Sequence, residues 1–213
     1  MNKPRILIAE DHTLVAEAFQ KLLQNQYEVL GIVTDGYALI SETKRLRPDI
    51  LIVDMAMPLL NGLDAGREVK NSFPHVKVIF VTMNEDRELA AEALSSGASG
   101  YLLKTSASSE LLRAVQEVLR GRSYITPRVS EQLLGDFIRD AGREPHPRHL
   151  TVRQRQVLQL LAEGRSMKEA ADILRITPRT IAFHKYRTME EFDIKSNAEL
   201  IRFAIREGLL KAS

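Results

Sequence analysis

The sequence predicts two folded parts: a doubly wound α/β domain with a five-stranded parallel sheet, followed by an all-α domain. Strand-like and helix-like patterns alternate five times over the first 120 residues, which is typical of parallel strands joined by crossover helices. The run Ile50–Asp54 has no polar break before its final carboxylate, as expected for a strand buried on both faces. From Leu150 onward the patterns are helical and separated by short turns.

The elements of the first domain follow from these patterns in chain order. The predicted strands are Arg5–Glu10, Glu28–Thr34, Ile50–Asp54, Lys77–Thr82 and Tyr101–Lys104. The first helix carries two apolar rows, Leu14/Ala18/Leu22 and Val15/Phe19/Leu23. The later helices are predicted at Tyr37–Leu46, from Asn61-Gly62 to before Pro74, up to about Ser96, and at Ser109–Leu119.

The second half of the chain is predicted to be helical apart from one linker. A sixth helix is expected at Pro127–Arg139, and the segment 141–148 is rich in Pro, Gly and charge, as linkers are. We therefore expect a domain at 1–125, a linker helix and flexible linker at 126–147, and a second domain at 148–213. Its helices are predicted at Thr151–Glu163, Ser166–Leu174, Pro178–Phe192 and Asn197–Glu207.

Composition and charge narrow the possible functions. The 213 residues include no cysteine, which excludes a disulfide framework and a cysteine-ligated metal. No apolar run approaches membrane-spanning length and the N-terminus does not resemble a signal peptide, so we expect a cytoplasmic protein with no membrane partner. Residues 1–138 carry 15 Lys/Arg against 18 Asp/Glu, whereas residues 150–213 carry 12 against 8. An acidic first part and a basic second part favour a regulatory domain joined to a nucleic-acid-binding one.

Polar side chains stand at the carboxyl ends of four predicted strands. Glu10-Asp11 ends the first, Asp54 the third, Thr82 the fourth and Lys104 the fifth. Ligands of open α/β sheets bind beyond these ends, and paired carboxylates suit Mg²⁺. A metal, a fixed cation and a hydroxyl together stabilise a phosphoryl group in transfer, with one carboxylate as nucleophile. The pattern therefore predicts an aspartate that becomes phosphorylated.

The first domain resembles the receiver domain of two-component response regulators. The resemblance rests on Glu10-Asp11-His12, on the run 54–62, on Val81-Thr82-Met83 and on the run 97–104, in matching order and spacing. It implies that Asp54 is the phosphoacceptor and that a sensor histidine kinase is the partner. It also implies that Mg²⁺ is held by Glu10, Asp11, Asp54 and the carbonyl of Ala56. Thr82 and Lys104 would contact the phosphoryl group, and Thr82 and Tyr101 would form the switch.

The second domain has the signals of a helix-turn-helix. Ser166 with Glu169 forms a capping-box pattern, and Thr177 with Pro178 is a strong helix start. The span 150–204 is similar to the LuxR-type helix-turn-helix domain, so the whole chain is identified as similar to the NarL/FixJ-type response regulators. The resemblance implies a phosphorylation-controlled transcription regulator that binds double-stranded DNA, dimerises when phosphorylated and then releases its recognition helix.

We expect the helix 178–192 to enter the major groove, with Ile181, Thr188 and Phe192 facing the core. The predicted DNA contacts are Arg179, Thr180, Ala182, Phe183, Lys185, Tyr186 and Arg187. An alternative for Phe183 and Tyr186 is packing against a neighbouring helix. The chain departs from the family pattern at Met167, Ala170, Arg175, Ala182, Glu190, Glu191 and Asp193. These departures predict weaker binding to DNA phosphates. Arg175 is expected in a turn that needs a positive φ.

The same residues bear on three other classes of function. A phosphohydrolase of the haloacid dehalogenase type needs a second Asp two residues after the first, but this sequence has Ala56 there, so we do not expect an enzyme. Flavin binding would follow from the fold by analogy alone. The alternative that stays open is a phosphorylation-regulated protein-interaction module whose helix-turn-helix binds DNA weakly or not at all.

Overall fold

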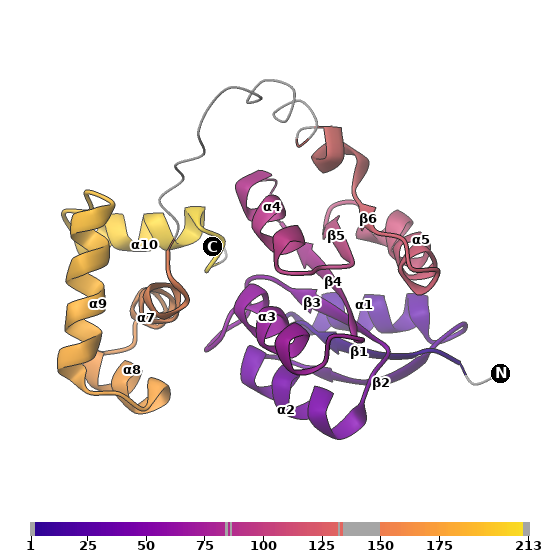
Figure 1. Cartoon of the computed structure of the whole chain (residues 1–213), viewed down its shortest axis with the longest axis horizontal. Coiled ribbons are helices and arrows are strands. Elements are labelled where there is room, and N and C mark those ends of the chain that lie inside the picture. The colour runs from indigo at the N-terminus through magenta and orange to yellow at the C-terminus, as the bar shows by residue number, and fades with distance from the viewer. Residues whose placement is uncertain (1–2, 84, 86, 132, 134–149, 211–213) are drawn as a thin grey trace.

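The chain forms an α/β domain and a helical domain in a computed structural model that describes residues 3–83, 85, 87–131, 133 and 150–210 (Figure 1). A six-stranded parallel sheet, ordered β2-β1-β3-β4-β5-β6, forms the centre of the α/β domain. Its strands are β1 Arg5–Ala9, β2 Glu28–Val33, β3 Ile50–Asp54, β4 Lys77–Thr82, β5 Gly100–Leu103 and β6 Tyr124–Ile125. The doubly wound parallel sheet is confirmed, with β6 as an addition to the five predicted strands. Its two residues pair with Gly100 and Tyr101 and are too short to show a strand pattern.

Alternate residues of each strand build a separate core on each face of the sheet. Leu51 and Val53 of β3 belong to the core covered by α2 Gly36–Leu46, α3 Gly62–Ser72 and α4 Arg87–Ser95. Ile50 and Ile52 belong to the opposite core, covered by α1 Thr13–Leu23 and α5 Ala107–Leu119. Because side chains of a strand alternate between faces, an unbroken apolar run supplies both cores at once.

Helix α1 buries one of its two predicted apolar rows. Phe19 and Leu23 are 5% and 0% exposed, while Leu14 at the start of the other row is 82% exposed. A helix lying on a sheet turns one stripe fully to the core, so Leu14 and Ala18 of the second row face outward, while Leu22 at its end packs half-buried against that core.

The helical domain consists of α7 Val152–Ala162, α8 Met167–Leu174, α9 Pro178–Glu191 and α10 Asn197–Arg206. The predicted capping box of Ser166 with Glu169 is present, and the Thr177 side chain caps α9 with Pro178 in its first turn. Ile181 and Thr188 are 0% and 2% exposed, so α9 turns the predicted stripe to the core. The predicted helix 127–139 begins at Pro127, but its remainder and the predicted linker lie largely outside the described residues.

The two domains are in contact through a loop of the α/β domain and the first helix of the helical domain. Leu59, between β3 and α3, packs against the cluster formed by residues of α7, α8 and α9. Figure 1 shows α7 on the side of its domain that faces the sheet, whereas α9 lies on the far side. None of the described helices is both long and apolar enough to cross a bilayer.

Candidate functional site

The predicted acidic rim exists, and most of it is buried. Glu10, Asp54 and Thr82 are 1%, 2% and 3% exposed and lie at the carboxyl ends of β1, β3 and β4. They come together because parallel strands end at the same edge of the sheet. Burying two carboxylates side by side is unfavourable unless a cation accompanies them.

Lys104 is the cation that the sheet supplies. Its Nζ lies 2.5 Å from Glu10 Oε2 and 2.9 Å from Asp54 Oδ2. The backbone N–H of Lys104 also donates to the backbone carbonyl of Thr82 at 2.8 Å, which fixes the end of β5 against the end of β4. The ammonium group is therefore held directly between two carboxylates of different strands.

Asp11 extends the rim toward solvent. The ligand atoms of Glu10, Asp11, His12 and Asp54 all lie within 4.8 Å of one another. His12 Nδ1 lies 3.2 Å from Glu10 Oε1 and 3.3 Å from Asp11 Oδ1, so the imidazole closes the turn into α1 as part of this cluster. The three carboxylates are hard oxygen donors with a partly open side, a donor set that fits Mg²⁺ and its waters.

The loop after Asp54 follows a tightly fixed path. The Ala56 N–H donates to Asp54 Oδ1 at 3.2 Å, and the Gly62 N–H donates to the Met55 carbonyl at 2.9 Å. Gly62 lies so close to β3 that a Cβ there would come within 2.0 Å of the Asp54 carbonyl oxygen. Glycine at 62 is therefore required for the loop to fold back onto the strand that carries Asp54.

Tyr101 is fully buried on β5, at 0% exposure. It packs in the core on the α3–α4 face of the sheet. The predicted switch pair of Thr82 and Tyr101 thus lies on adjacent strands, with both side chains inside the domain.

The predicted DNA contacts lie on α9, and each of them is exposed or partly exposed. Phe183 and Tyr186 are 56% and 59% exposed, which is against the alternative that they pack on a neighbouring helix. The Arg187 guanidinium lies over the Phe183 ring and the Lys185 ammonium lies over the Tyr186 ring, so each aromatic side chain has a positive charge beside it. The other members, which are exposed or partly exposed, are Arg179, Thr180 and Ala182.

This arrangement differs from the expected release of a covered recognition helix. The α/β domain touches α7, and the outer side chains of α9 remain accessible. His184, behind that surface, has its pKa lowered by burial and by the nearby Arg153 and Arg187 guanidinium groups.

The departures from the family pattern have structural consequences. Arg175, at the end of α8, adopts φ 53 and ψ 46, so the predicted need for a positive φ is confirmed. Glu191 accepts a hydrogen bond from Gln154 Nε2 at 2.9 Å, which ties α9 to α7. The Glu191 carboxylate is therefore bonded within the helical domain, and this bond reduces its repulsion of DNA phosphates.

Sequence reasoning missed the residues that join the domains. Gln159 of α7 is fully buried and its side-chain amide bonds to the loop between β3 and α3. Arg155, one turn earlier, is 2% exposed and lies 3.5 Å from Asp64 of α3 and 2.5 Å from Glu92 of α4. Burial raises the pKa of Asp64, and Arg155 with Asn61 opposes that rise. The only sequence signal for this contact was a run of polar residues on one face of α7, and such a run is equally consistent with a solvent-exposed face.

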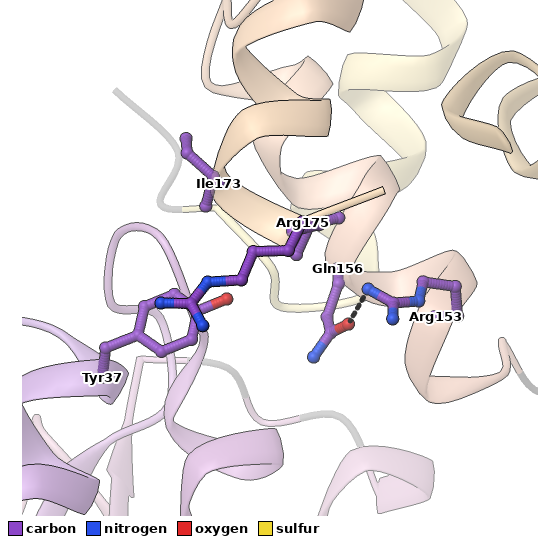
Figure 2. A pocket seen from close by; sticks show the side chains of 6 residues that line it. Tyr37, Arg153, Gln156, Ile173 and Arg175 are labelled. Carbon is purple, nitrogen blue, oxygen red and sulfur yellow. Dashed lines mark hydrogen bonds between the residues drawn. The ribbon is translucent and has the colours of Figure 1, made fainter. Parts of the chain in front are cut away.

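A pocket of about 620 Å³ also lies between the domains (Figure 2). Tyr37 of α2 forms one wall, and Arg175 reaches toward it from the end of α8. Arg153 Nη1 donates to Gln156 Oε1 at 3.2 Å within the pocket. The remaining lining residues are Ile173 and Leu174.

Comparisons with known protein families cover both domains. Residues 6–116 match the family described as the response regulator receiver domain, and residues 148–204 match the one described as bacterial regulatory proteins of the luxR family. The chain is 34% identical over 214 residues to the oxygen regulatory protein NreC of Staphylococcus carnosus, covering 97% of this chain and 99% of that one. It is 32% identical over 215 residues to NreC of Staphylococcus aureus, with the same coverage.

Solved structures of full-length relatives have the same architecture. A structure of the Salmonella typhimurium response regulator RcsB matches with a TM-score of 0.71 at 27% identity, covering 96% of this chain and 98% of that one. RcsB of Salmonella enterica serovar Typhimurium bound to a promoter in the presence of the phosphomimetic BeF₃⁻ matches with a TM-score of 0.69 at 27% identity. That match covers 95% of this chain and 98% of the other.

Proposed function

Because this chain belongs to the NarL/FixJ-type response regulators, which join a receiver domain to a LuxR-type helix-turn-helix domain, we propose that Asp54 is its phosphoacceptor. The protein is a DNA-binding transcription regulator controlled by phosphorylation, and it belongs to a family of transcription regulators. The division into 1–125, 126–147 and 148–213 is also proposed, supported by the two family matches.

One observation carries the assignment of Asp54. Its carboxylate lies 2.9 Å from Lys104 Nζ, and both groups are buried at the same strand edge. When an Asp54 oxygen attacks a phosphohistidine of a sensor kinase, an O–P bond forms and the P–N bond breaks, and the imidazole leaves. Lys104 and Thr82 then stabilise the charge on the phosphoryl oxygens, which is the main demand of phosphoryl transfer.

Mg²⁺ is the proposed cofactor, because the rim offers hard oxygen donors on a partly open side. The groups that would hold the ion are the carboxylates of Glu10, Asp11 and Asp54 and the carbonyl of Ala56. A bound Mg²⁺ would neutralise charge on the incoming phosphoryl group. Asp11 is the most accessible of the three carboxylates and would orient the waters of the ion.

Double-stranded DNA is the proposed ligand of α9, and a homodimer the proposed form of the phosphorylated protein. Arg179, Lys185 and Arg187 would hold phosphates, while Ala182, Phe183 and Tyr186 would face base edges, with Thr180 beside them. Related structures support this, since one is of an RcsB–DNA complex and another is of two RcsB dimers bound to two parallel DNAs. A regulator of this kind works where the chromosome is, so we place it in the cytoplasm.

The Thr180 hydroxyl has a second role that limits its use. It lies 2.9 Å from the Thr177 hydroxyl at the start of α9, and the Thr180 N–H donates to that same oxygen at 3.2 Å. The Thr180 hydroxyl is therefore already bonded to the capping residue of the helix when Thr180 approaches DNA.

The deciding experiment is phosphorylation of the full-length protein with acetyl phosphate and Mg²⁺, followed by mass spectrometry. One phosphoryl group should be added, and Asp54→Asn should abolish the addition. Asp64→Asn is the matched control, because Asp64 is a buried carboxylate outside the strand edge. Label that persists on the Asp54→Asn protein contradicts the assignment.

A further inference from the structure

We propose that Gln159, in the first helix of the helix-turn-helix domain, is a positioning residue of the phosphorylation site. Through its side-chain amide the DNA-binding domain holds the loop that follows Asp54, so occupancy of Asp54 and the contact between the domains are linked. This inference rests on the proposed role of Asp54.

The Gln159 amide uses its full hydrogen-bonding capacity at the domain boundary. Nε2 donates to the Met57 carbonyl at 2.6 Å and to Glu163 Oε1 at 2.8 Å. Oε1 accepts from the Asn61 N–H at 2.9 Å and from Asn61 Nδ2 at 3.2 Å. An amide has two donors and two acceptor sites, so every one of them is engaged. The partners also fix which end of the amide is nitrogen, because only Nε2 can donate to the Met57 carbonyl.

These bonds hold both ends of one short loop. Met57 and Asn61 flank it, and between them the Leu59 N–H donates to Glu163 Oε1 at 3.1 Å. Leu59 adopts φ 66, a region that is unfavourable for a residue with a side chain. Such a conformation persists only where neighbours determine it, and here the Leu60 N–H bond to the Pro58 carbonyl is joined by contacts from the other domain.

The held loop begins at the reactive residue. Ala56, whose N–H donates to Asp54 Oδ1, is the direct neighbour of Met57. A phosphoryl group on Asp54 adds strong anionic acceptors, and hydrogen bonds to such acceptors are shorter and stronger. A shift of the Ala56 N–H toward that charge also displaces the next residue, Met57, and with it the Met57 carbonyl. The 2.6 Å bond to Gln159 then lengthens or breaks.

The linkage must run in both directions. If phosphorylation weakens the Gln159 contact, then loss of the contact must favour the occupied form of Asp54 by the same factor. Coupling between sites is typically 5- to 150-fold in affinity. The outer side chains of the recognition helix stay accessible in this contact, since Phe183 and Tyr186 on α9 are exposed.

The test compares Gln159→Met with Gln156→Met in the full-length protein. Both substitutions replace an amide of α7 by an apolar side chain of similar length, but Gln156 lines the pocket and accepts its hydrogen bond from Arg153 of the same helix. The probe is beryllofluoride with Mg²⁺, which binds an aspartate carboxylate as a phosphoryl analogue and gives an equilibrium affinity. Gln159→Met should bind it at least about fivefold more tightly than the wild type. Gln156→Met should match the wild type.

A second variant guards against misfolding of the first. Glu163→Ala removes the acceptor of the Leu59 N–H and should tighten beryllofluoride binding in the same direction by a smaller factor. Unchanged or weaker binding in both Gln159→Met and Glu163→Ala overturns the inference. Failure of the proposed function is distinguishable, because the wild type itself would then bind no beryllofluoride.

Discussion

Arg155 of the helix-turn-helix domain and Glu92 of the receiver domain form an ion pair across the domain boundary, with Arg155 Nη2 2.5 Å from Glu92 Oε1. The same guanidinium group lies 3.5 Å from Asp64 Oδ1, so one arginine joins α7 to both α3 and α4. Arg67 reaches the same two carboxylates from within the receiver domain. Because Arg155 is 2% exposed, these carboxylates take the place of solvent around its guanidinium group.

Replacing Arg155 by Met should separate the domains. Removing one partner of a buried ion pair typically costs about 3–5 kcal/mol, and Arg67, which stays beside Glu92 and Asp64, should reduce that cost here. The chain has no cysteine, so Lys44→Cys and Lys168→Cys provide a clean dye pair for energy transfer between the domains. Transfer should fall in Arg155→Met and persist in Arg153→Met, whose arginine pairs with Gln156. Equal transfer in both variants would contradict a role of Arg155 at the boundary.

Replacing Lys104 by Met should destabilise the receiver domain in a way that Mg²⁺ relieves. The substitution leaves the Glu10 and Asp54 carboxylates buried together without their ammonium partner, at a cost of about 3–5 kcal/mol. Millimolar Mg²⁺ should restore part of the loss, because an ion that binds only the folded state stabilises it. Urea unfolding with and without Mg²⁺ measures both effects. Lys70→Met, at a lysine bonded to the Pro74 carbonyl, should show no such rescue.

Two substitutions on α9 should affect DNA binding differently. Lys185→Ala should weaken binding to all sequences and reduce the salt slope by about one unit, as expected for a phosphate contact. Tyr186→Ala, at a side chain 59% exposed, should relax sequence preference with little change in slope. Gel shifts over a salt series on specific and scrambled DNA separate the two outcomes. If both proteins stay folded and bind as the wild type does, the placement of α9 in the groove is wrong.

Replacing Arg175 by Gly should stabilise the helix-turn-helix domain by about 1 kcal/mol. Arg175 holds φ 53, where a Cβ is unfavourable and glycine is not. Chemical unfolding measures the gain, and Arg175→Ala is the control because it removes the guanidinium but keeps the Cβ. A gain of the same size in Arg175→Ala would assign the effect to the side chain in the pocket rather than to the backbone.

The domain contact should strengthen as the pH falls toward the ordinary pKa of a glutamate. Burial raises the pKa of Glu163, while hydrogen bonds from Gln159 and from the Leu59 N–H oppose the rise. A carboxyl group whose pKa is raised in the contact favours that contact when protonated, and its contribution is lost as the pH rises through the raised pKa. The energy transfer described for Arg155 should therefore increase on mild acidification. Glu163→Gln, which has no proton to gain, should remove this part of the pH dependence, and an unchanged profile would exclude Glu163 as its source.

The fold and the acidic strand edge that carries Asp54 could be predicted from the sequence. Apolar runs such as Ile50–Asp54 specify a strand locally, and parallel strands bring Glu10, Asp54, Thr82 and Lys104 to one edge wherever the helices lie. Even the positive φ at Arg175 followed from a local turn pattern. The strand β6 escaped prediction because two residues show no period, and the exposure of Leu14 escaped because two equivalent rows leave the buried one undecided.

The way the DNA-binding domain meets the receiver depends on tertiary contacts and could not be predicted from the sequence. Gln159 and Asn61 are 98 positions apart in sequence, and their hydrogen bonds exist only once both domains are folded and docked. Nothing in the local pattern of α7 distinguishes a glutamine that faces solvent from one that holds another domain's loop. Secondary structure depends on neighbours along the chain, whereas a buried polar contact depends on partners that folding brings from elsewhere, so Gln159 could be recognised only from the structure.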